Sequence, residues 1–245
     1  AKIKDSKDAL KENDYEGAIG ALSVAEKFAN EAGIKVPEEI FNLRKEAYKI
    51  GVQAKINDVK QAIKDNDYVA AVGGCNVVEL FAQRAGVKVP EELKDLRLEA
   101  YKLAVREKLK EAKAAVEAKE YADVFAGIAG VEIYAKKAGV EIPKEVEDLR
   151  KKGYEIACYA KINEAKEQIT NNDPDCLASL NVASAYAKKA GIEEPEEISK
   201  LKTKAHAIFA LYKYNSAKET IESDPVDSLV NLQLTEKHCK LGNIS

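Results

Sequence analysis

A dipeptide that ends in glycine returns about every 53 residues along this chain of 245 residues. It reads Ala-Gly at residues 32–33, 85–86, 138–139 and 190–191, and Leu-Gly at residues 241–242. A proline follows four residues after each of the first four glycines, at positions 37, 90, 143 and 195. Self-similarity at a fixed period is typical of proteins that stack one structural unit many times, so a repeat architecture is expected.

The recurring glycines and prolines of each repeat predict two helices. A glycine after an apolar-periodic run ends one helix, and a proline near the first helical position begins the next. Glutamates directly after Pro37, Pro90 and Pro195 favour the positive end of a helix dipole. We expect a long helix over residues 37–64 in the first complete copy, a polar turn at 66–68, and a second helix that ends at the next Ala-Gly. This gives alternating helices of about 27 and about 17 residues, without alternating strand patterns.

The long helix carries apolar residues on two opposite flanks. Positions 43, 47, 50 and 54 form one flank, and positions 52, 56, 59 and 63 form the other. A helix that is apolar on two flanks packs between two neighbours, as stacked repeats require. The predicted fold class is therefore all-α, an α-solenoid of about 4.5 helix-turn-helix units. We expect a single helical-repeat domain over residues 1–245, with repeats at 1–33, 34–86, 87–139, 140–191 and 192–242.

The two ends of the chain differ in their place within the repeat. Residues 2–15 match residues 55–68, so the chain begins in the middle of a long helix and stops just after a short one. This pattern predicts a segment of a longer array, or an array with an abbreviated N-terminal cap.

The stretch Asn13-Asp14-Tyr15-Glu16-Gly17-Ala18-Ile19, with Ala25 after it, resembles the turn and second helix of a tetratricopeptide repeat. Residues 66–72 and 120–125 echo the same pattern. The resemblance covers about a third of each repeat, and the period of about 53 exceeds the tetratricopeptide period of 34 residues. What the resemblance implies is a tetratricopeptide-like solenoid with a concave surface for a peptide or protein partner.

The composition restricts the classes of partner and the compartment that the chain suits. The formal net charge is only −3 and the pI is about 5.7, with charges of both signs interspersed, so no long-range field attracts nucleic acid or an anionic membrane. The longest apolar stretches fall far short of the roughly 20 residues that a membrane span needs. The four cysteines show no Cys-x-x-Cys spacing and no repeat periodicity, which favours unpaired thiols in a reducing, cytoplasmic compartment. A secreted or surface form of a longer chain stays open.

Signatures of catalysis are missing from the sequence. The two histidines, His206 and His238, lack metal-ligand spacing, and His206 occupies a position that is tyrosine in the other copies. No phosphate-binding loop or dinucleotide fingerprint is present. We therefore predict a protein that is not an enzyme and that uses neither a cofactor nor a metal; the sequence points to no small-molecule ligand.

Three columns of equivalent positions on the long helices are the candidate partner-binding site. They comprise Arg44, Arg97, Arg150 and Lys202; Lys55, Lys108, Lys161 and Lys213, with Lys2 in the first copy; and Tyr48, Tyr101 and Tyr154. A helix turns 100° per residue, so the two basic columns share one face within about 20°. Arginine suits carboxylate recognition through its bidentate fork.

These columns support two interpretations. In the first, they bind an acidic or extended peptide, and the chain is a non-enzymatic scaffold or adaptor; this assignment rests on analogy of fold. In the second, the cations pair with first-turn glutamates or with neighbouring repeats, the tyrosines pack between helices, and the chain is a structural array or spacer. An artificial helical-repeat binding scaffold is a third alternative, disfavoured by the divergence of the repeats.

Overall fold

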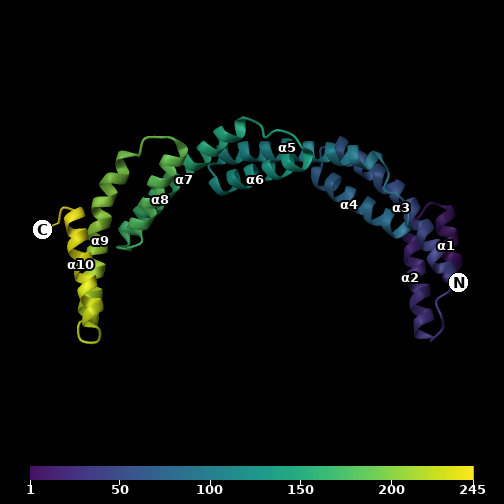
Figure 1. The fold of residues 1–245 in the computed structure, drawn as a ribbon, viewed down its shortest axis with the longest axis horizontal. Helices are drawn as coiled ribbons and strands as arrows, with labels where there is room; N and C mark the ends of the chain where they lie inside the picture. Colours follow the sequence, from purple (N-terminus) through teal and green to yellow (C-terminus); the bar gives the residue numbers. More distant parts are fainter. Residues whose placement is uncertain (245) are drawn as a thin grey trace. The chain divides into compact units, whose positions relative to one another are not determined.

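The computed structural model describes residues 1–244 and consists of ten α-helices joined by short connections (Figure 1). No strand occurs in that range, and the predicted all-α fold of successive helical hairpins is confirmed. The helices are α1 (Lys2–Lys11), α2 (Tyr15–Glu31), α3 (Glu38–Lys64), α4 (Tyr68–Ala85), α5 (Glu92–Ala118), α6 (Tyr121–Ala138), α7 (Glu145–Thr170), α8 (Cys176–Ala190), α9 (Glu196–Thr220) and α10 (Pro225–Leu241). Long helices of 25 to 27 residues thus alternate with short ones of 15 to 18 from α2 onward.

The chain divides into two compact parts. The first part comprises Ala1–Lys108 and Gly130–Ile142, and the second comprises Leu109–Ala129 and the described residues from Pro143 onward.

Local sequence explains where the helices begin. Asp14, Asp67 and Asp224 each accept a hydrogen bond from a backbone amide three residues later, at 2.8, 2.9 and 3.0 Å. These aspartates therefore cap α2, α4 and α10. The prolines lie just outside the long helices that they introduce: Pro37, with φ −59° and ψ 136°, and Pro195 directly precede α3 and α9, whereas Pro90 and Pro143 lie two residues before α5 and α7.

In four copies, the short helix ends at the glycine that the sequence predicts. Gly33, Gly86, Gly139 and Gly191 all have a positive φ, between 64° and 74°, which ends the helix in the left-handed conformation. The fifth copy differs from the expected Leu241-Gly242 alignment: Asn243 takes the left-handed position with φ 52°, whereas Gly242 has φ −89°. Asparagine tolerates this conformation, so the last repeat is 52 residues from its predecessor.

In the first part, α3 packs between α4 and α2. Val52, Ile56 and Val59 of α3 form a buried cluster with Cys75, Val78 and Ala82 of α4 and Leu93 of α5. The opposite flank of α3 contacts α2. In the second part, Ile162 of α7, Leu180 of α8 and Ile198 of α9 belong to an equivalent cluster. The two apolar flanks predicted for the long helix are therefore both used.

Successive long helices are also joined by a repeated ion pair. A lysine near the end of one helix contacts a glutamate in the first turn of the next. The pairs are Lys7–Glu39 and Lys60–Glu92 in the first part, at 2.6 Å each, and Lys113–Glu145 and Lys166–Glu197 in the second, at 2.6 and 2.9 Å. Such exposed pairs contribute less than about 1 kcal/mol each, but they define the register in which each hairpin meets the next.

Candidate interaction surface

The arginine column lies where a long helix meets the short helix of the preceding repeat. The Arg44 guanidinium contacts Glu26 at 2.6 Å, and that of Arg97 contacts Glu79 at 2.6 Å. Arg97 also donates to the carbonyl oxygen of Cys75 at 3.1 Å. The Glu79 contact raises the pKa of Arg97, and the Arg97 hydrogen bond lowers the pKa of Glu79. The guanidinium groups of Arg44 and Arg97 are therefore engaged with the protein itself.

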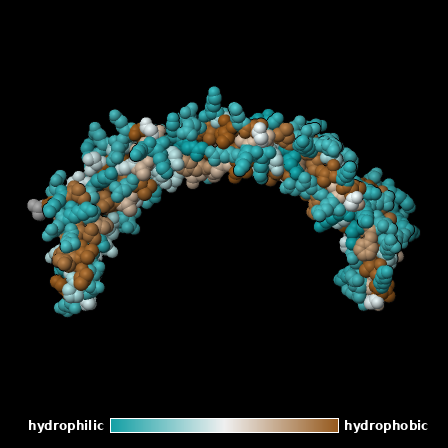
Figure 2. All heavy atoms as spheres, in the orientation of Figure 1, coloured by the Kyte–Doolittle hydropathy of each residue, from teal (hydrophilic) through white to brown (hydrophobic). Residues whose placement is uncertain are grey.

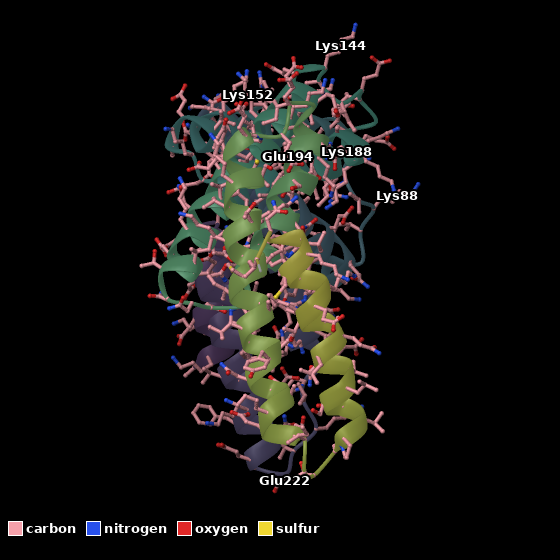
Figure 3. The ribbon with its side chains drawn as sticks, turned by 90° about the vertical axis from the view of Figure 1, so that its left-hand side faces the viewer. Lys88, Lys144, Lys152, Lys188, Glu194 and Glu222 are labelled. Atoms are coloured by element: carbon pink, nitrogen blue, oxygen red, sulfur yellow. The ribbon has the colours of Figure 1, made fainter. Side chains whose placement is uncertain are left out.

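The second part continues this column with Arg150 and Lys202. Arg150 lies 3.4 Å from Glu147 of the same helix. Lys202 donates to the Ser184 hydroxyl at 2.8 Å and lies 3.4 Å from Glu194, which Figure 3 labels at the connection into α9. All four members of the column thus have a partner within the chain.

The lysine column meets the next turn of its own helix or an aromatic ring. Lys55 contacts Asp58 at 2.9 Å, and this hydrogen bond, followed by one with Tyr15, raises the pKa of Lys55. Lys161 and Lys2 make the same type of contact, with Glu164 at 2.6 Å and Asp5 at 2.9 Å. Lys108 lies over the Tyr68 ring at 5.4 Å, and Lys213 lies over those of Phe209 and Tyr212 at 5.7 and 5.5 Å. A cation over an aromatic face contributes about 0.5–1 kcal/mol at exposed sites.

The tyrosine column packs against an aromatic column on the short helices. The ring pairs are Tyr48–Phe81 at 5.2 Å and Tyr101–Tyr134 at 6.0 Å in the first part, and Tyr154–Tyr186 at 5.7 Å in the second. The tyrosines therefore join the two helices of one hairpin.

Three basic residues that sequence reasoning missed lie over the same tyrosines. Arg84 lies 5.4 Å from the centre of the Tyr48 ring and donates to its hydroxyl at 2.8 Å. Lys137 lies 5.7 Å from the Tyr101 ring. In the second part, Lys189 lies 5.1 Å from the Tyr154 ring, which itself packs against the ring of Tyr186. The signal in the sequence is a basic residue two positions before Gly86, Gly139 and Gly191, on the short helices rather than the long ones.

A cavity of about 660 Å³ opens beside this arrangement in the first part. Its lining includes Arg97, Tyr101 and Lys137 together with the apolar residues Leu93 and Leu98. Glu79, Glu91 and Asp95 also line it, so the cavity presents charges of both signs beside apolar residues.

The last repeat replaces the aromatic pair by two histidines. His206 occupies the tyrosine position, and His238 of α10 occupies the position of Tyr186, counted from the left-handed residue that ends the helix. Their Nδ1 atoms lie 2.9 Å apart, and their rings pack at 4.9 Å. One imidazole therefore donates this hydrogen bond to the other, which requires that at least one of them is neutral.

Acidification is expected to destabilise the α9–α10 hairpin through this pair. Burial lowers the pKa of both histidines, and the charges of Lys202 on His206 and of His206 and Lys237 on His238 lower them further. The unfolded chain then binds protons at a higher pH than the folded chain, so stability is full above the unfolded pKa near 6.5 and is lost as pH falls below it. Loss of one buried hydrogen bond predicts a destabilisation of about 1–3 kcal/mol between pH 7.5 and 5.

Hydrogen exchange of α10 at both pH values measures this effect. The control is the double substitution His206→Tyr with His238→Tyr, which restores the ring pair of the other repeats and should remove the pH dependence. An equal loss of protection in parent and control at pH 5 would contradict the assignment.

Other chemistry finds no support in the part of the chain that the structure describes. Residues 1–244 hold no group of three or more His, Cys, Asp or Glu side chains that could hold a metal ion. Within the same residues, no helix is long and apolar enough to cross a membrane. The four cysteines are unpaired, and burial raises the pKa of the Cys75, Cys158 and Cys176 thiols, which disfavours the nucleophilic thiolate form.

No protein-family model, no curated protein and no solved structure matches this chain.

Proposed function

We propose that this chain is a non-enzymatic scaffold that binds an acidic segment of a protein or peptide. The observation that carries the proposal is the repeated placement of Arg84, Lys137 and Lys189 over the tyrosine column. All three are exposed, and none contacts a carboxylate within residues 1–244. They differ in this from Arg44 and Arg97, whose guanidinium groups are already bound to glutamates.

The chemistry of these cations favours carboxylate binding. A cation that lies over a ring is held in place on one side and keeps its outward donors available. A partner carboxylate then gains a charged hydrogen bond without first displacing an internal ion pair. In the first part, the partly exposed Leu98 of the neighbouring cavity is available to an apolar residue of the same peptide. This mode of binding, along a stack of helical hairpins, is also what the tetratricopeptide-like pattern of residues 13–25 implies.

A charge-reversal pair tests the proposal. The variant carries Arg84→Glu and Lys137→Glu, and the control carries Lys35→Glu and Lys64→Glu, which change the net charge equally at exposed positions without a carboxylate partner. The probe is a fluorescein-labelled 15-residue peptide of alternating glutamate and leucine, followed by fluorescence anisotropy at low salt. Because a hydrogen bond to a charged group contributes about 1.5–3 kcal/mol, we expect at least a tenfold weaker affinity for the variant.

The control should bind within twofold of the parent chain, and all three proteins should show equal helicity. Equal affinities of the variant and the control would mean that the peptide binds only through non-specific charge attraction, which would contradict the proposed site. Absence of saturable binding by the parent at millimolar peptide would overturn the proposal.

A structural array or spacer is the second candidate function. The repeated ion pairs from Lys7–Glu39 to Lys166–Glu197 favour it, because they stabilise the stack itself and leave those charges with little to offer a partner. The same titration separates the two, since a spacer predicts no binding by any of the three proteins.

A further inference from the structure

The hairpin of α9 and α10 departs from the preceding hairpins at three positions of one ring pair. Its long helix carries His206 in place of a tyrosine, and its short helix carries His238 in place of a phenylalanine or tyrosine. Two positions before the left-handed residue it carries Leu241, where the other repeats place a basic residue over the tyrosine ring. The residues replaced, repeat by repeat, are Tyr48, Phe81 and Arg84; Tyr101, Tyr134 and Lys137; and Tyr154, Tyr186 and Lys189. Both rings thus gain nitrogen atoms, and the cation over the ring pair is lost.

The two imidazoles place equivalent nitrogen atoms against each other. Although 32 residues separate the histidines in the sequence, their Nδ1 atoms lie 2.9 Å apart, and their ring planes meet at 53°. Two imidazole nitrogens that bind one metal ion, each at about 2.0–2.1 Å, lie about 2.9–3.4 Å apart for bond angles from square-planar to tetrahedral. The pair is therefore already at the distance that chelation needs. The expectation of no metal rested on the spacing of the histidines in the sequence, which does not indicate this contact.

The surroundings hold both rings in place. His238 is 9% exposed, and its ring packs against that of Phe209 at 4.5 Å. Gly242 lies close to His206, since a Cβ atom on this glycine would lie 3.3 Å from the His206 Cβ atom. Hydrophobic atoms gather over α9 and α10 on the face that Figure 2 shows. His206 itself is partly exposed, which leaves one side open to an ion and to water. Little ordering is then needed when an ion binds.

The donor set decides which ions suit the pair. Neither imidazole bonds to a carboxylate of residues 1–244, so both Nδ1 lone pairs have only each other as partners. Mg²⁺ and Ca²⁺ prefer oxygen ligands, whereas imidazole suits Zn²⁺, Ni²⁺ and Cu²⁺. The charges of Lys202 and Lys237 act on the rings and oppose a bound cation. Lys202 is itself 3.4 Å from Glu194, which offsets part of its charge.

We propose that His206 and His238 together bind one divalent transition-metal ion, of the class of Zn²⁺, Ni²⁺ and Cu²⁺, through their Nδ1 atoms. The proton between the two rings moves to the Nε2 atom of the ring that carries it, so both rings bind as neutral imidazoles and no proton is released at pH 7.5. Water fills the remaining positions, because residues 1–244 hold no group of three or more metal-binding side chains. The site shares no residue with the Arg84, Lys137 and Lys189 surface, so the inference goes beyond the proposed function and stands or falls separately from it.

Nuclear magnetic resonance of the imidazoles reads the site directly, because the chain holds only two histidines. Zinc chloride is titrated into the full chain, labelled with ¹⁵N, at pH 7.5. Without zinc, one ring should carry its proton on Nδ1, as the hydrogen bond between the rings requires. With zinc, both rings should carry the proton on Nε2, and the change should saturate at one ion per chain in the submillimolar range.

Substitutions of the histidines locate the ion. Isothermal titration with nickel chloride should show at least tenfold weaker binding for His206→Tyr and for His238→Tyr, since a single imidazole lacks the gain from chelation. Each change restores the residue type of the other repeats. Cys239→Ser is the matched control and should bind within twofold of the parent, because Cys239 follows His238 by one residue and points to another side of α10.

A second pair of variants leaves both histidines in place. Leu241→Lys restores the cation that the other repeats place over the ring pair, and it should weaken nickel binding at least threefold through charge repulsion. Leu241→Gln, of similar size and without a charge, should bind within twofold of the parent. Leu241 is 52% exposed, so neither change disturbs a packed core. This pair decides the matter if a histidine variant loses helicity in circular dichroism.

Three outcomes would overturn the inference. One is no saturable binding of zinc or nickel at millimolar concentration. Another is binding that leaves the two imidazole tautomers unchanged, or that Cys239→Ser weakens while the histidine variants do not, since a thiol or carboxylates would then hold the ion. The third is equal binding by Leu241→Lys and Leu241→Gln when the histidine variants are misfolded. Loss of the acidic-peptide binding described under Proposed function would leave this inference unchanged.

Discussion

Leu180→Ala is expected to lower the free energy of unfolding of the second part by about 3 kcal/mol, because truncating a fully buried leucine costs its transfer free energy and leaves a cavity. Leu180 of α8 is fully buried in the cluster that α7, α8 and α9 form. Leu232→Ala changes the same position of the next repeat, where part of the side chain already contacts solvent. We expect that substitution to cost less than about 1 kcal/mol.

Urea denaturation followed by circular dichroism, together with hydrogen exchange of α8 and α10, measures both losses. Stacked repeats often unfold in stages, so the exchange of each helix is needed beside the global curve. Equal losses for the two variants would show that Leu232 is as buried in solution as Leu180, and would contradict the difference in exposure between the two leucines.

Gly51→Ala is expected to destabilise the first part by about 1–3 kcal/mol, although alanine favours a helix over glycine. Gly51 lies inside α3, and a Cβ atom there would lie 2.8 Å from the Phe81 ring and 3.0 Å from the Tyr15 ring. These two rings contact each other at 5.9 Å, and Phe81 also packs on Tyr48 at 5.2 Å. Because three aromatic rings converge at this point, a Cβ atom would force at least one of these packed rings to shift.

Gly73→Ala is the matched control for that substitution. Gly73 lies inside α4, and a Cβ atom there would meet nothing within 4 Å. The control should therefore stabilise the chain by about 0.5–1 kcal/mol, the helix preference of alanine over glycine. Thermal unfolding of both variants checks the prediction, and a stabilising Gly51→Ala would mean that the Tyr15–Phe81 contact does not persist in solution.

The aromatic rings around Gly51 also link the lysine column to the packing between repeats. Tyr15 at the start of α2 lies against Phe81 of α4 and within 6.0 Å of Lys55 of α3, so one tyrosine joins two successive hairpins. Tyr68 repeats this arrangement with Tyr134 and Lys108 in the same part. The lysine column thus contributes to the contact between repeats, whatever it offers to a partner.

The sequence by itself determined the elements of this protein. The expected helix over residues 37–64 is found as Glu38–Lys64, and Asp224 caps α10 with Pro225 at its first helical position. These features follow from local physics: proline and glycine restrict or free the backbone, and an aspartate reaches an amide three residues away. The 53-residue period then fixed the architecture, because equivalent helices in a stack need equivalent neighbours.

Only the tertiary structure decided what the side chains of these helices contact. Helical spacing places Arg97 on a face, but it does not indicate that Glu79, 18 residues earlier and on another helix, neutralises it. The same limit hid Lys137, whose place over Tyr101 depends on how α5 and α6 meet within the first part. The exposure of Leu232 could not be predicted from the sequence either, because Leu232 occupies the same repeat position as Leu180. The two leucines differ in exposure because no helix covers Leu232 in the described structure. A side chain's partners depend on distances across the chain, which no local pattern encodes.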